Sequence, residues 1–249
     1  MTYSIVARNE TTGEIGVAVA SRFFACGAQV PWVSATAAIA SQAFANPLWG
    51  VEGLMRLDGG EAPAAVLADF RERDAGQASR QAHFLAPDGR MVQHTGAACV
   101  PWAGHVAAPG VSVAGNMLTG PDVVRDTLAS YLDHADTPFP ERLLTAMEAG
   151  EAAGGDKRGR QAAGLVIHAG QAYPYLDIRA DDHADPLAEL RRLLAVSKER
   201  YLLFAQSMAT AENFSGVTDR GPLDEAIADE ETRRADLGVA SRSFAVPPT

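Results

Sequence analysis

The chain has 249 residues, a formal net charge of -10 and an isoelectric point near 5.0. Nucleic acid and anionic membrane surfaces would be repelled on average by this charge, so we expect neither as the main partner. The length and a hydrophobic content of 47% predict a large core in one α/β or α+β domain, and two small domains are the less favoured division.

Apolar runs in the sequence fall short of the roughly 20 residues that a membrane-spanning helix needs. The pattern of a secretory leader, a charged stretch followed by an apolar one and small residues, does not precede the first predicted strand. We therefore expect a soluble, cytoplasmic protein. Cys26 and Cys99 form no C-x-x-C spacing, and we expect both to be buried thiols.

The N-terminal part of the chain predicts a hairpin, a third strand and a pair of helices. Two segments rich in β-branched residues flank turn formers at 9–13, so residue 2 stands at the start of a core strand. Asn46 and Pro47 have the pattern of a helix N-cap followed by proline, and Gly59-Gly60 is a stop signal. The expected strands are 3–8, 14–21 and 33–42, and the expected helices are 47–60 and 63–73.

The rest of the chain repeats this order and ends in a polar segment. Pro87-Asp88-Gly89 is typical of a turn between two short strands, and Asp185-Pro186 is typical of a helix start. The composition turns polar and irregular beyond residue 209, so 210–249 is expected to be an arm or a frayed tail. The expected strands are 81–86, 90–94, 105–114, 164–168 and 173–178, and the expected helices are 121–132, 140–152 and 186–201.

The order of these elements predicts the architecture. Hairpins separated by helix pairs indicate antiparallel sheets with helices packed outside, whereas strict strand–helix alternation would indicate a parallel sheet. We therefore predict an α+β fold, a four-layer αββα sandwich of two antiparallel sheets, over residues 1–209. Folds of this kind commonly pack their outer helices against a second copy of the chain, and the helix at 187–201 has an apolar face. We therefore predict a homo-oligomer.

Several short stretches resemble a known fold. The opening hairpin that starts at a threonine, the segment VAVASR and the element order resemble the N-terminal-nucleophile (Ntn) hydrolase superfamily, particularly its proteasome-subunit branch. Over residues 2–194 the chain also resembles a bacterial family of unknown function assigned to that fold. The segments that carry this narrower resemblance are MTYSIVAR, GVAVASRFF, QAFANPLWG, VPWAGH, GNMLTGP, GGDKRGRQAA and YLDIRADDHADP.

The resemblance implies a nucleophile at Thr2. An N-terminal threonine carries a hydroxyl and a free α-amine whose reference pKa is about 7.7–8.0, so the amine can accept the hydroxyl proton near neutral pH. Removal of Met1, which is general when the second residue is small, would expose Thr2 without self-cleavage. The alternative interpretation is that Thr2 is merely a tolerated second residue.

Two loops carry the other candidate residues that the resemblance implies. In GNMLTG, Asn116 can donate from its amide to an oxyanion, and Thr119 offers a hydroxyl. In GGDKRG, Asp156 can hold the amine and Arg158 can bind a substrate carboxylate. The alternatives are a helix cap for the first loop and a surface position for Arg22, which could otherwise place positive charge near the amine.

The chain also departs from the proteasome-like pattern. Ala20 stands where that branch usually has an aspartate. Lys157 and Lys198 are the only lysines, so none lies in the region where the strand after the first hairpin would present one. The function predicted is therefore an N-terminal-nucleophile amidohydrolase or peptidase that acts on a small amide or peptide. The alternative is a non-catalytic assembly or ligand-binding member of the fold. A cell-wall-linked hydrolase is a third hypothesis, although no peptidoglycan-binding segment is recognisable.

Other motifs predict no metal or cofactor. Gly154 and Gly159 have the spacing of a phosphate-binding loop, but Arg160-Gln161 replaces the required Lys-Ser/Thr pair. The acidic cluster around His183 is explained by a solvated loop and by Asp185 as a helix cap. His94 and His105 are expected to be structural, with a place in a cleft as the alternative.

Overall fold

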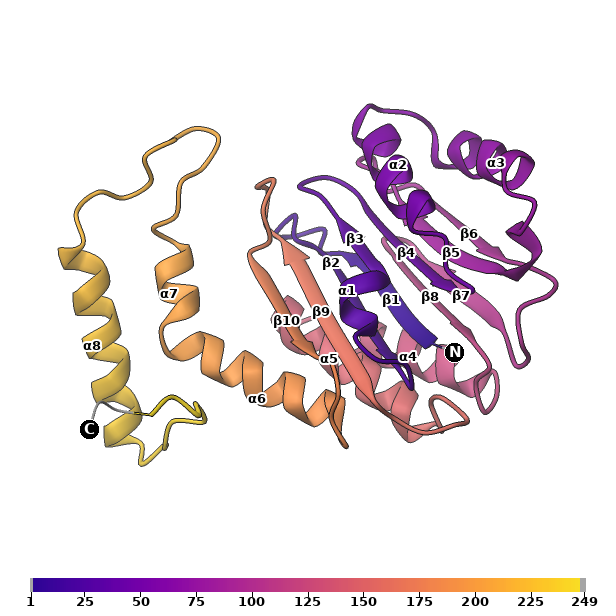
Figure 1. The fold of residues 1–249 in the computed structure, drawn as a ribbon. Coiled ribbons are helices and arrows are strands. Elements are labelled where there is room, and N and C mark those ends of the chain that lie inside the picture. Colours follow the sequence, from indigo (N-terminus) through magenta and orange to yellow (C-terminus); the bar gives the residue numbers. More distant parts are fainter. Residues whose placement is uncertain (1, 247–249) are drawn as a thin grey trace. The chain divides into compact units, whose positions relative to one another are not determined.

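Two antiparallel sheets and eight α-helices make up the part of the chain, residues 2–246, that this computed structural model describes (Figure 1). The protein is therefore a mixed α+β protein. It divides into two compact units, residues 1–190 and 191–249. Both sheets lie in the first unit.

The larger sheet has six strands in the order β10-β9-β2-β1-β8-β7. Each neighbouring pair is antiparallel, and β1 lies at the centre between β2 and β8. The strands are β1 (Thr2–Arg8), β2 (Ile15–Ser21), β7 (Gly104–Ala108), β8 (Val111–Asn116), β9 (Ala162–His168) and β10 (Leu176–Ala180).

The smaller sheet has four strands in the order β3-β4-β5-β6, again all antiparallel. Its strands β4 and β5 face β1, β2 and β8 of the larger sheet. The strands are β3 (Pro31–Val33), β4 (Ala38–Ala43), β5 (Arg80–Leu85) and β6 (Met91–Thr95).

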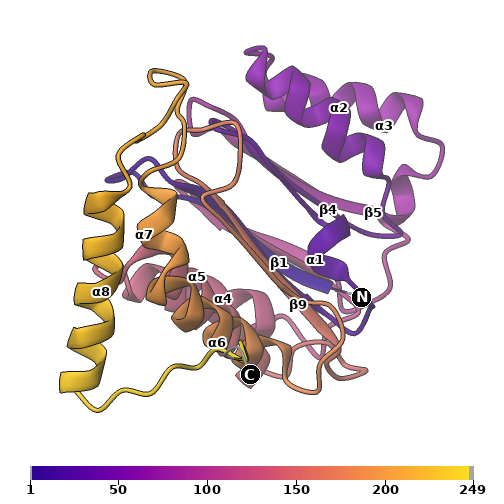
Figure 2. The same cartoon turned by 60° about the vertical axis from the view of Figure 1, so that its left-hand side comes forward.

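Helices cover the sheets in pairs. The pair α2 (Pro47–Asp58) and α3 (Pro63–Arg73) packs on the smaller sheet, and the pair α4 (Asp122–Asp133) and α5 (Phe139–Ala152) packs on the larger one (Figure 2). Asn46 caps α2 as predicted, since its side-chain oxygen accepts from the backbone N–H of Leu48 at 3.0 Å. A short helix, α1 (Cys26–Gln29), lies against β2 and β9.

Side chains alternate between the two faces of β1. The Tyr3 hydroxyl donates to the carbonyl oxygen of Met147 on α5, so Tyr3 faces the helices. The Ser4 hydroxyl donates to Oε1 of Gln42 on β4, so Ser4 faces the smaller sheet. Because Thr2 has the same parity as Ser4, the side chain of Thr2 lies on the face between the sheets.

The apolar core has two layers, one between the sheets and one beneath α2 and α3. The layer between the sheets contains Val6, Ile15, Val17, Val19, Cys26, Val30, Ala38, Ala40, Leu85 and Ala162. The layer beneath the helices contains Ala37, Ile39, Trp49, Leu57, Val66, Leu67, Phe70, Ala82, Phe84 and Ala86.

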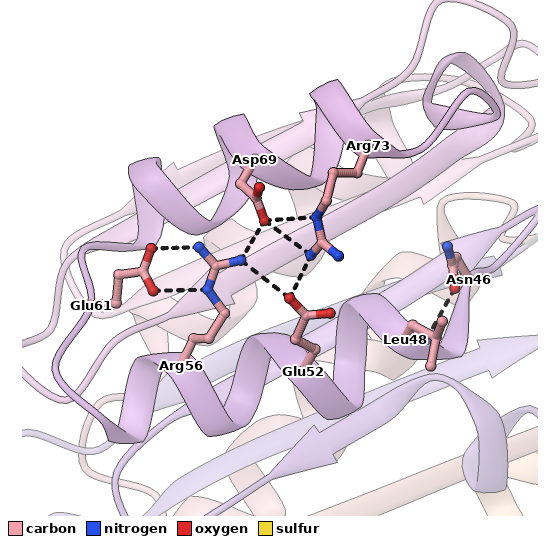
Figure 3. A network of polar contacts seen from close by, with 7 residues as sticks. All are labelled: Asn46, Leu48, Glu52, Arg56, Glu61, Asp69 and Arg73. Atoms are coloured by element: carbon pink, nitrogen blue, oxygen red, sulfur yellow. Dashed lines mark hydrogen bonds and ion pairs between the residues drawn. The ribbon is translucent and has the colours of Figure 1, made fainter.

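Ion pairs join α2 to α3 above this second layer (Figure 3). Arg56 of α2 pairs with Glu61 in the connecting loop and with Asp69 of α3, and Arg73 of α3 pairs with Glu52 of α2. Hydrogen bonds from Arg56 hold the pKa values of Glu61 and Asp69 below their ordinary ranges. Because these groups are near the surface, the network fixes the orientation of the two helices more than it adds stability.

Two segments that the sequence predicts as single strands are hairpins. Residues 33–42 divide into β3 and β4, because Ser34 makes a turn in which its hydroxyl oxygen accepts from the backbone N–H of Thr36 and of Ala37. Residues 105–114 divide into β7 and β8 at Gly110, whose φ of 71° suits glycine. Both predictions of one strand were wrong for the same reason: a short turn interrupts an otherwise continuous β pattern.

The C-terminal predictions also need correction. The last strand is β10 (Leu176–Ala180) rather than 173–178, and the helix predicted over 186–201 ends earlier, as α6 (Pro186–Glu199). Leu187 and Leu190 of α6 are buried, so this face does not offer the apolar surface that the sequence suggested for self-association. The second unit contains α7 (Tyr201–Ala205) and α8 (Gly221–Asp236), and the sequence analysis did not predict α8.

None of the helices in residues 2–246 combines the length and apolarity that crossing a bilayer requires.

The contact between α1 and β9 depends on two glycines. A Cβ atom added to Gly164 would lie 2.5 Å from the Cα atom of Gly27, a backbone atom that cannot turn aside. Gly164→Ala should therefore lower the free energy of unfolding by about 2 kcal/mol, because α1 must move off the sheet. Chemical denaturation measures this loss. Gly120→Ala is the matched control, since nothing lies within 4 Å of its added Cβ, and a loss as large as that of Gly164→Ala would contradict the explanation.

Candidate active site

Thr2 lies at the start of the central strand of the larger sheet. Thr2 is only 5% exposed, and its hydroxyl donates to Oγ of Ser21, on β2, at 3.2 Å. On the other side Thr2 is paired with Asn116, at the end of β8. The Asn116 amide nitrogen lies 3.4 Å from the carbonyl oxygen of Thr2. The strand register therefore places the predicted nucleophile and the predicted oxyanion donor side by side.

A chain of buried polar side chains continues from Asn116 into the space between the sheets. The Asn116 amide donates to Oε1 of Gln81 at 2.9 Å, and the amide of Gln42 donates to the same oxygen at 2.9 Å. Gln42 Oε1 in turn accepts from the Ser4 hydroxyl at 2.8 Å. All four residues are at most 2% exposed. The amides of Gln42 and Gln81 are held at both nitrogen and oxygen, so the Gln81 oxygen to which Asn116 donates is fixed in place.

The same chain ends at His83, which is fully buried between two serines. His83 Nε2 lies 2.9 Å from Ser4 Oγ, and His83 Nδ1 lies 3.0 Å from Ser112 Oγ. The only proton of the Ser4 hydroxyl is directed to Gln42, so Ser4 accepts from Nε2–H and Ser112 donates to Nδ1. This assignment makes His83 a neutral imidazole, and burial lowers its pKa to about 3.

The lowered pKa of His83 predicts acid sensitivity. Its stabilising contribution is complete above the unfolded pKa of about 6.5 and is lost as the pH falls toward the folded pKa of about 3. Each pH unit in this window costs up to about 1.4 kcal/mol. The free energy of unfolding of the wild-type chain should therefore fall between about pH 6.5 and about pH 4.5. This fall should be about 2 to 3 kcal/mol larger than the fall in the His83→Gln variant over the same range.

Denaturant titrations at several pH values measure this difference. The matched control is His134→Gln, because His134 is exposed and should leave the wild-type pH dependence unchanged. An equal pH dependence in wild type and His83→Gln would show that His83 is not held neutral by its surroundings.

Asp156 is the second centre of the site. Its side chain is 2% exposed, and it accepts from the backbone N–H of Arg22 and from the backbone N–H of Arg158, both at 2.8 Å. The Arg158 guanidinium adds a contact at 3.3 Å. Arg22 and Arg158 also donate to each other's carbonyl oxygens, at 2.7 and 2.9 Å. Asp156 lies in the loop between α5 and β9, and its hydrogen bond with Arg22 connects this loop to the end of β2.

The structure therefore arranges five of the six predicted residues in two groups. Thr2 and Asn116 form one, and Arg22, Asp156 and Arg158 form the other. The groups are connected through the Ser21–Arg22 peptide, and the hydrogen bonds of the Asp156 carboxylate join it to the two arginines. Thr119 lies outside both groups, where its hydroxyl contacts the carbonyl oxygen of Ala153 at 3.4 Å. The removal of Met1 is a prediction that lies outside the described residues.

Two pockets flank this end of the sheet, and Ala43 and Phe44 line both. The Thr2 pocket has a volume of about 290 Å³, and the Asn116 pocket has a volume of about 300 Å³. The Thr2 pocket is lined by Thr2, Phe23, Cys26, Gln29, Val30, Gln42, Ala43, Phe44 and Ala45. The Asn116 pocket is lined by Ala43, Phe44, Ser79, Ala98, Cys99, Val100, Asn116 and Met117.

Strained backbone conformations occur at the same place. Within residues 2–246, Ala25, Ala43 and Met117 are the non-glycine residues with positive φ, at 54°, 69° and 59°. Ala43 and Met117 line the pockets, and Ala25 directly precedes Cys26. Left-handed conformations cost a residue with a side chain of the order of 1 kcal/mol, and such strain is concentrated at functional sites.

Each pocket contains one cysteine. Both cysteines are buried free thiols, as predicted. Burial raises the pKa of Cys26 to about 12 and also raises the pKa of Cys99. At neutral pH both groups are therefore protonated thiols, and neither is a nucleophile that would compete with Thr2.

The sequence analysis missed the polar side chains between the sheets and a half-buried carboxyl group, Glu151. Glu151 Oε2 lies 3.2 Å from the Tyr3 hydroxyl oxygen, Glu151 pairs with Arg160 at 3.3 Å, and burial raises its pKa. A sequence signal could have identified the polar side chains between the sheets. Ser4, Gln81 and His83 occupy inward-facing positions within strands that also carry buried apolar residues, and a polar side chain there needs a partner.

The motifs that the sequence analysis set aside have structural partners. His94 Nε2 contacts the carbonyl oxygen of Gln77 at 2.8 Å, and Asp185 caps α6 through the N–H of Ala188 at 3.2 Å. Throughout residues 2–246, no group of three or more His, Cys, Asp and Glu side chains is arranged to hold a metal ion.

Comparison with known proteins identifies a family and similar solved structures. The model of a family described as "Family of unknown function (DUF1028)" matches residues 2–190, which is the span of the first compact unit. The crystal structure of a Silicibacter pomeroyi protein of the same family has 27% sequence identity and a TM-score of 0.80. That match covers 88% of this chain and 99% of the other chain. No curated protein matches the chain.

Proposed function

The chain belongs to this family of unknown function, and we propose that within it the protein is an N-terminal-nucleophile amidohydrolase that acts on a small amide or peptide. The fold we propose is the four-layer αββα sandwich of the Ntn hydrolases. The observation that carries the proposal is the placement of Thr2. Thr2 lines a pocket at the end of a central strand, next to an amide donor that is bound to a buried network.

In the proposed reaction Thr2 becomes the first residue of the mature chain. Its Oγ1 attacks the amide carbonyl carbon, and the hydroxyl proton passes to the α-amine. Collapse of the tetrahedral intermediate breaks the C–N bond, and the leaving nitrogen takes up that proton. Water then hydrolyses the resulting ester to a carboxylic acid and restores the Thr2 hydroxyl.

Asn116 supplies the charge stabilisation in this proposal. One of its N–H groups is bound to Gln81 at 2.9 Å, while the other makes a long contact of 3.4 Å with the Thr2 carbonyl oxygen. The long contact is weak by the usual geometry of hydrogen bonds, so a substrate oxyanion can replace it. Ser21 positions the Thr2 hydroxyl, and Asp156 positions Ser21 through the next residue, Arg22.

Two measurements on the purified full chain test the proposal together. Intact-mass spectrometry should show the loss of Met1, and a panel of uncharged aryl amides should release amine at a rate that depends on protein concentration. A chain that retains Met1 has no free Thr2 amine, so that result would overturn the enzyme proposal. It would favour the second candidate, a non-catalytic binding member of the fold, which the mutual pairing of Asp156 with Arg22 and Arg158 supports.

We also propose that the protein acts in the cytoplasm and forms homo-oligomers. The surface that supports self-association is α2 rather than the helix predicted from the sequence. Leu48, Val51 and Met55 follow each other at helical spacing on α2, and they are 65%, 52% and 68% exposed.

A further inference from the structure

The linings of the Thr2 pocket and the Asn116 pocket have one property in common. Every side chain that lines either pocket is uncharged, and the polar ones are Thr2, Gln29, Gln42, Ser79 and Asn116. A charged group on a ligand would therefore leave water without meeting a side chain of opposite charge, which is unfavourable.

The arginines near these linings already have hydrogen-bond partners. Arg22, which precedes Phe23, donates to the carbonyl oxygen of Arg158 at 2.7 Å, and the guanidinium of Arg158 donates to Asp156 and to the carbonyl oxygen of Arg22. Arg80, which follows Ser79, pairs with Asp74 at 3.0 Å, and its side chain is 14% exposed. A ligand carboxylate at the pockets would have to compete with these partners for an arginine, and breaking the buried pair of Arg80 and Asp74 is costly.

The entrance to the two pockets is aromatic. Phe44, which lines both, is 74% exposed, and Phe23 at the rim of the Thr2 pocket is 53% exposed. Val100 at the rim of the Asn116 pocket is 45% exposed. Arg80 stabilises the position of Phe44, since its guanidinium carbon lies 5.1 Å from the ring centroid. Exposed aromatic side chains that border a concave site are typical of ligand recognition.

Each of the two pockets is large enough for one substituent of a substrate amide. A cavity of about 150 Å³ holds a benzene molecule, so volumes of about 290 and 300 Å³ can each hold an aromatic or branched aliphatic group. The reacting residue Thr2 belongs to one pocket and its strand partner Asn116 to the other. A scissile amide between them would therefore direct its acyl side into one pocket and its amine side into the other.

We propose that the substrate of this site is an amide whose groups on both sides of the scissile bond are uncharged, with an aromatic or aliphatic group on at least one side. This inference rests on the proposed amidohydrolase function. It excludes substrates with a free carboxylate next to the scissile bond, because no side chain that lines either pocket is cationic. The α-amine of Thr2 does not replace such a side chain, because a carboxylate beside it would favour the protonated amine, which cannot act as the base in the proposed reaction.

A matched pair of ligands tests the inference without requiring turnover. N-acetyl-L-phenylalaninamide and N-acetyl-L-phenylalanine differ only by an amide in place of a carboxylate, and calorimetry gives the affinity of the full chain for each. We expect the amide to bind at least tenfold more tightly than the carboxylate. Equal affinities, tighter binding of the carboxylate, or no binding of either would overturn the inference.

Two variants and a control make the test specific. Phe44→Ala should weaken binding of the amide at least fivefold, whereas Phe214→Ala, at a residue 95% exposed in the second unit, should leave it unchanged. Gln29→Lys adds a cation to the lining of the Thr2 pocket and should tighten binding of the carboxylate. Unchanged affinities in Phe44→Ala and Gln29→Lys would show that the ligand binds elsewhere.

The outcomes also separate this inference from the proposed function. Binding of the amide with the expected preference but no release of ammonia would contradict the amidohydrolase and leave the ligand class intact. Hydrolysis of charged amides as fast as uncharged ones would support the amidohydrolase and contradict the ligand class.

Discussion

Thr2→Ala is expected to lower kcat/KM for amide hydrolysis by about 10⁶-fold, a loss comparable to that seen when a hydrolase loses its nucleophile. The substitution removes the attacking oxygen and keeps the backbone and the α-amine. Thr2→Ser keeps both hydroxyl and amine, so it should retain a measurable part of the activity. The comparison of the two variants in an amine-release assay separates the chemistry of the hydroxyl from its packing.

Two further hydroxyls serve as controls for this prediction. Ser21→Ala removes the group that accepts from Thr2 at 3.2 Å, so it should cost about tenfold through loss of positioning. Thr119→Ala removes a hydroxyl that contacts the Ala153 carbonyl oxygen outside both groups, so it should leave kcat nearly unchanged. Full activity in Thr2→Ala would exclude Thr2 as the nucleophile, and a loss in Thr119→Ala equal to that in Thr2→Ala would mean that the wrong hydroxyl has been assigned.

Asp156→Ala should lower the free energy of unfolding by about 3 kcal/mol, because it leaves two partly buried backbone N–H groups, those of Arg22 and Arg158, without their charged acceptor. The same change should reduce activity, since Arg22 follows Ser21, the partner of Thr2. Chemical denaturation measures the first effect and the amine-release assay the second.

Asp88→Ala is a closely matched control for Asp156→Ala. Asp88 also accepts from the backbone N–H two residues on, at 3.0 Å, and also pairs with the arginine at that position. Its side chain is 50% exposed, against 2% for Asp156, and it holds no second segment of the chain. We expect Asp88→Ala to cost less than about 1 kcal/mol. Similar losses in the two variants would contradict the role given to burial and to the bond with Arg22.

Elements with strong local signals could be predicted from the sequence. The opening hairpin, the Asn46 cap of α2, the two helix pairs and the Asp185 cap all depend on residues within a few positions of each other. The predictions failed where a short turn interrupted a β pattern, at Ser34 and at Gly110, and where local preference is weak, as in α1, whose N-cap Ala25 has a left-handed conformation.

The interior of the candidate site could not be predicted for a different reason. The network that holds Asn116 joins Ser4, Gln42, Gln81 and His83 from β1, β4 and β5, which only the pairing of the two sheets brings together. Asp156 and Arg22 are 134 positions apart. The sequence suggested the residue types through the resemblance, but the division of five of the six candidates into two groups, with Thr119 outside both, depends on tertiary contacts.

Mass spectrometry of an acylated N-terminal peptide tests the central role of Thr2 most directly. The full chain and Thr2→Ala are incubated with the p-nitrophenyl ester of N-acetyl-L-phenylalanine, quenched in acid and digested. The N-terminal peptide of the wild-type chain should begin at Thr2 and carry one acyl group that hydroxylamine removes, as expected for an ester on Oγ1, and Thr2→Ala should carry no such group. A wild-type peptide that begins at Met1, or a hydroxylamine-sensitive acyl group found on another residue, would contradict the assignment of Thr2 as the nucleophile.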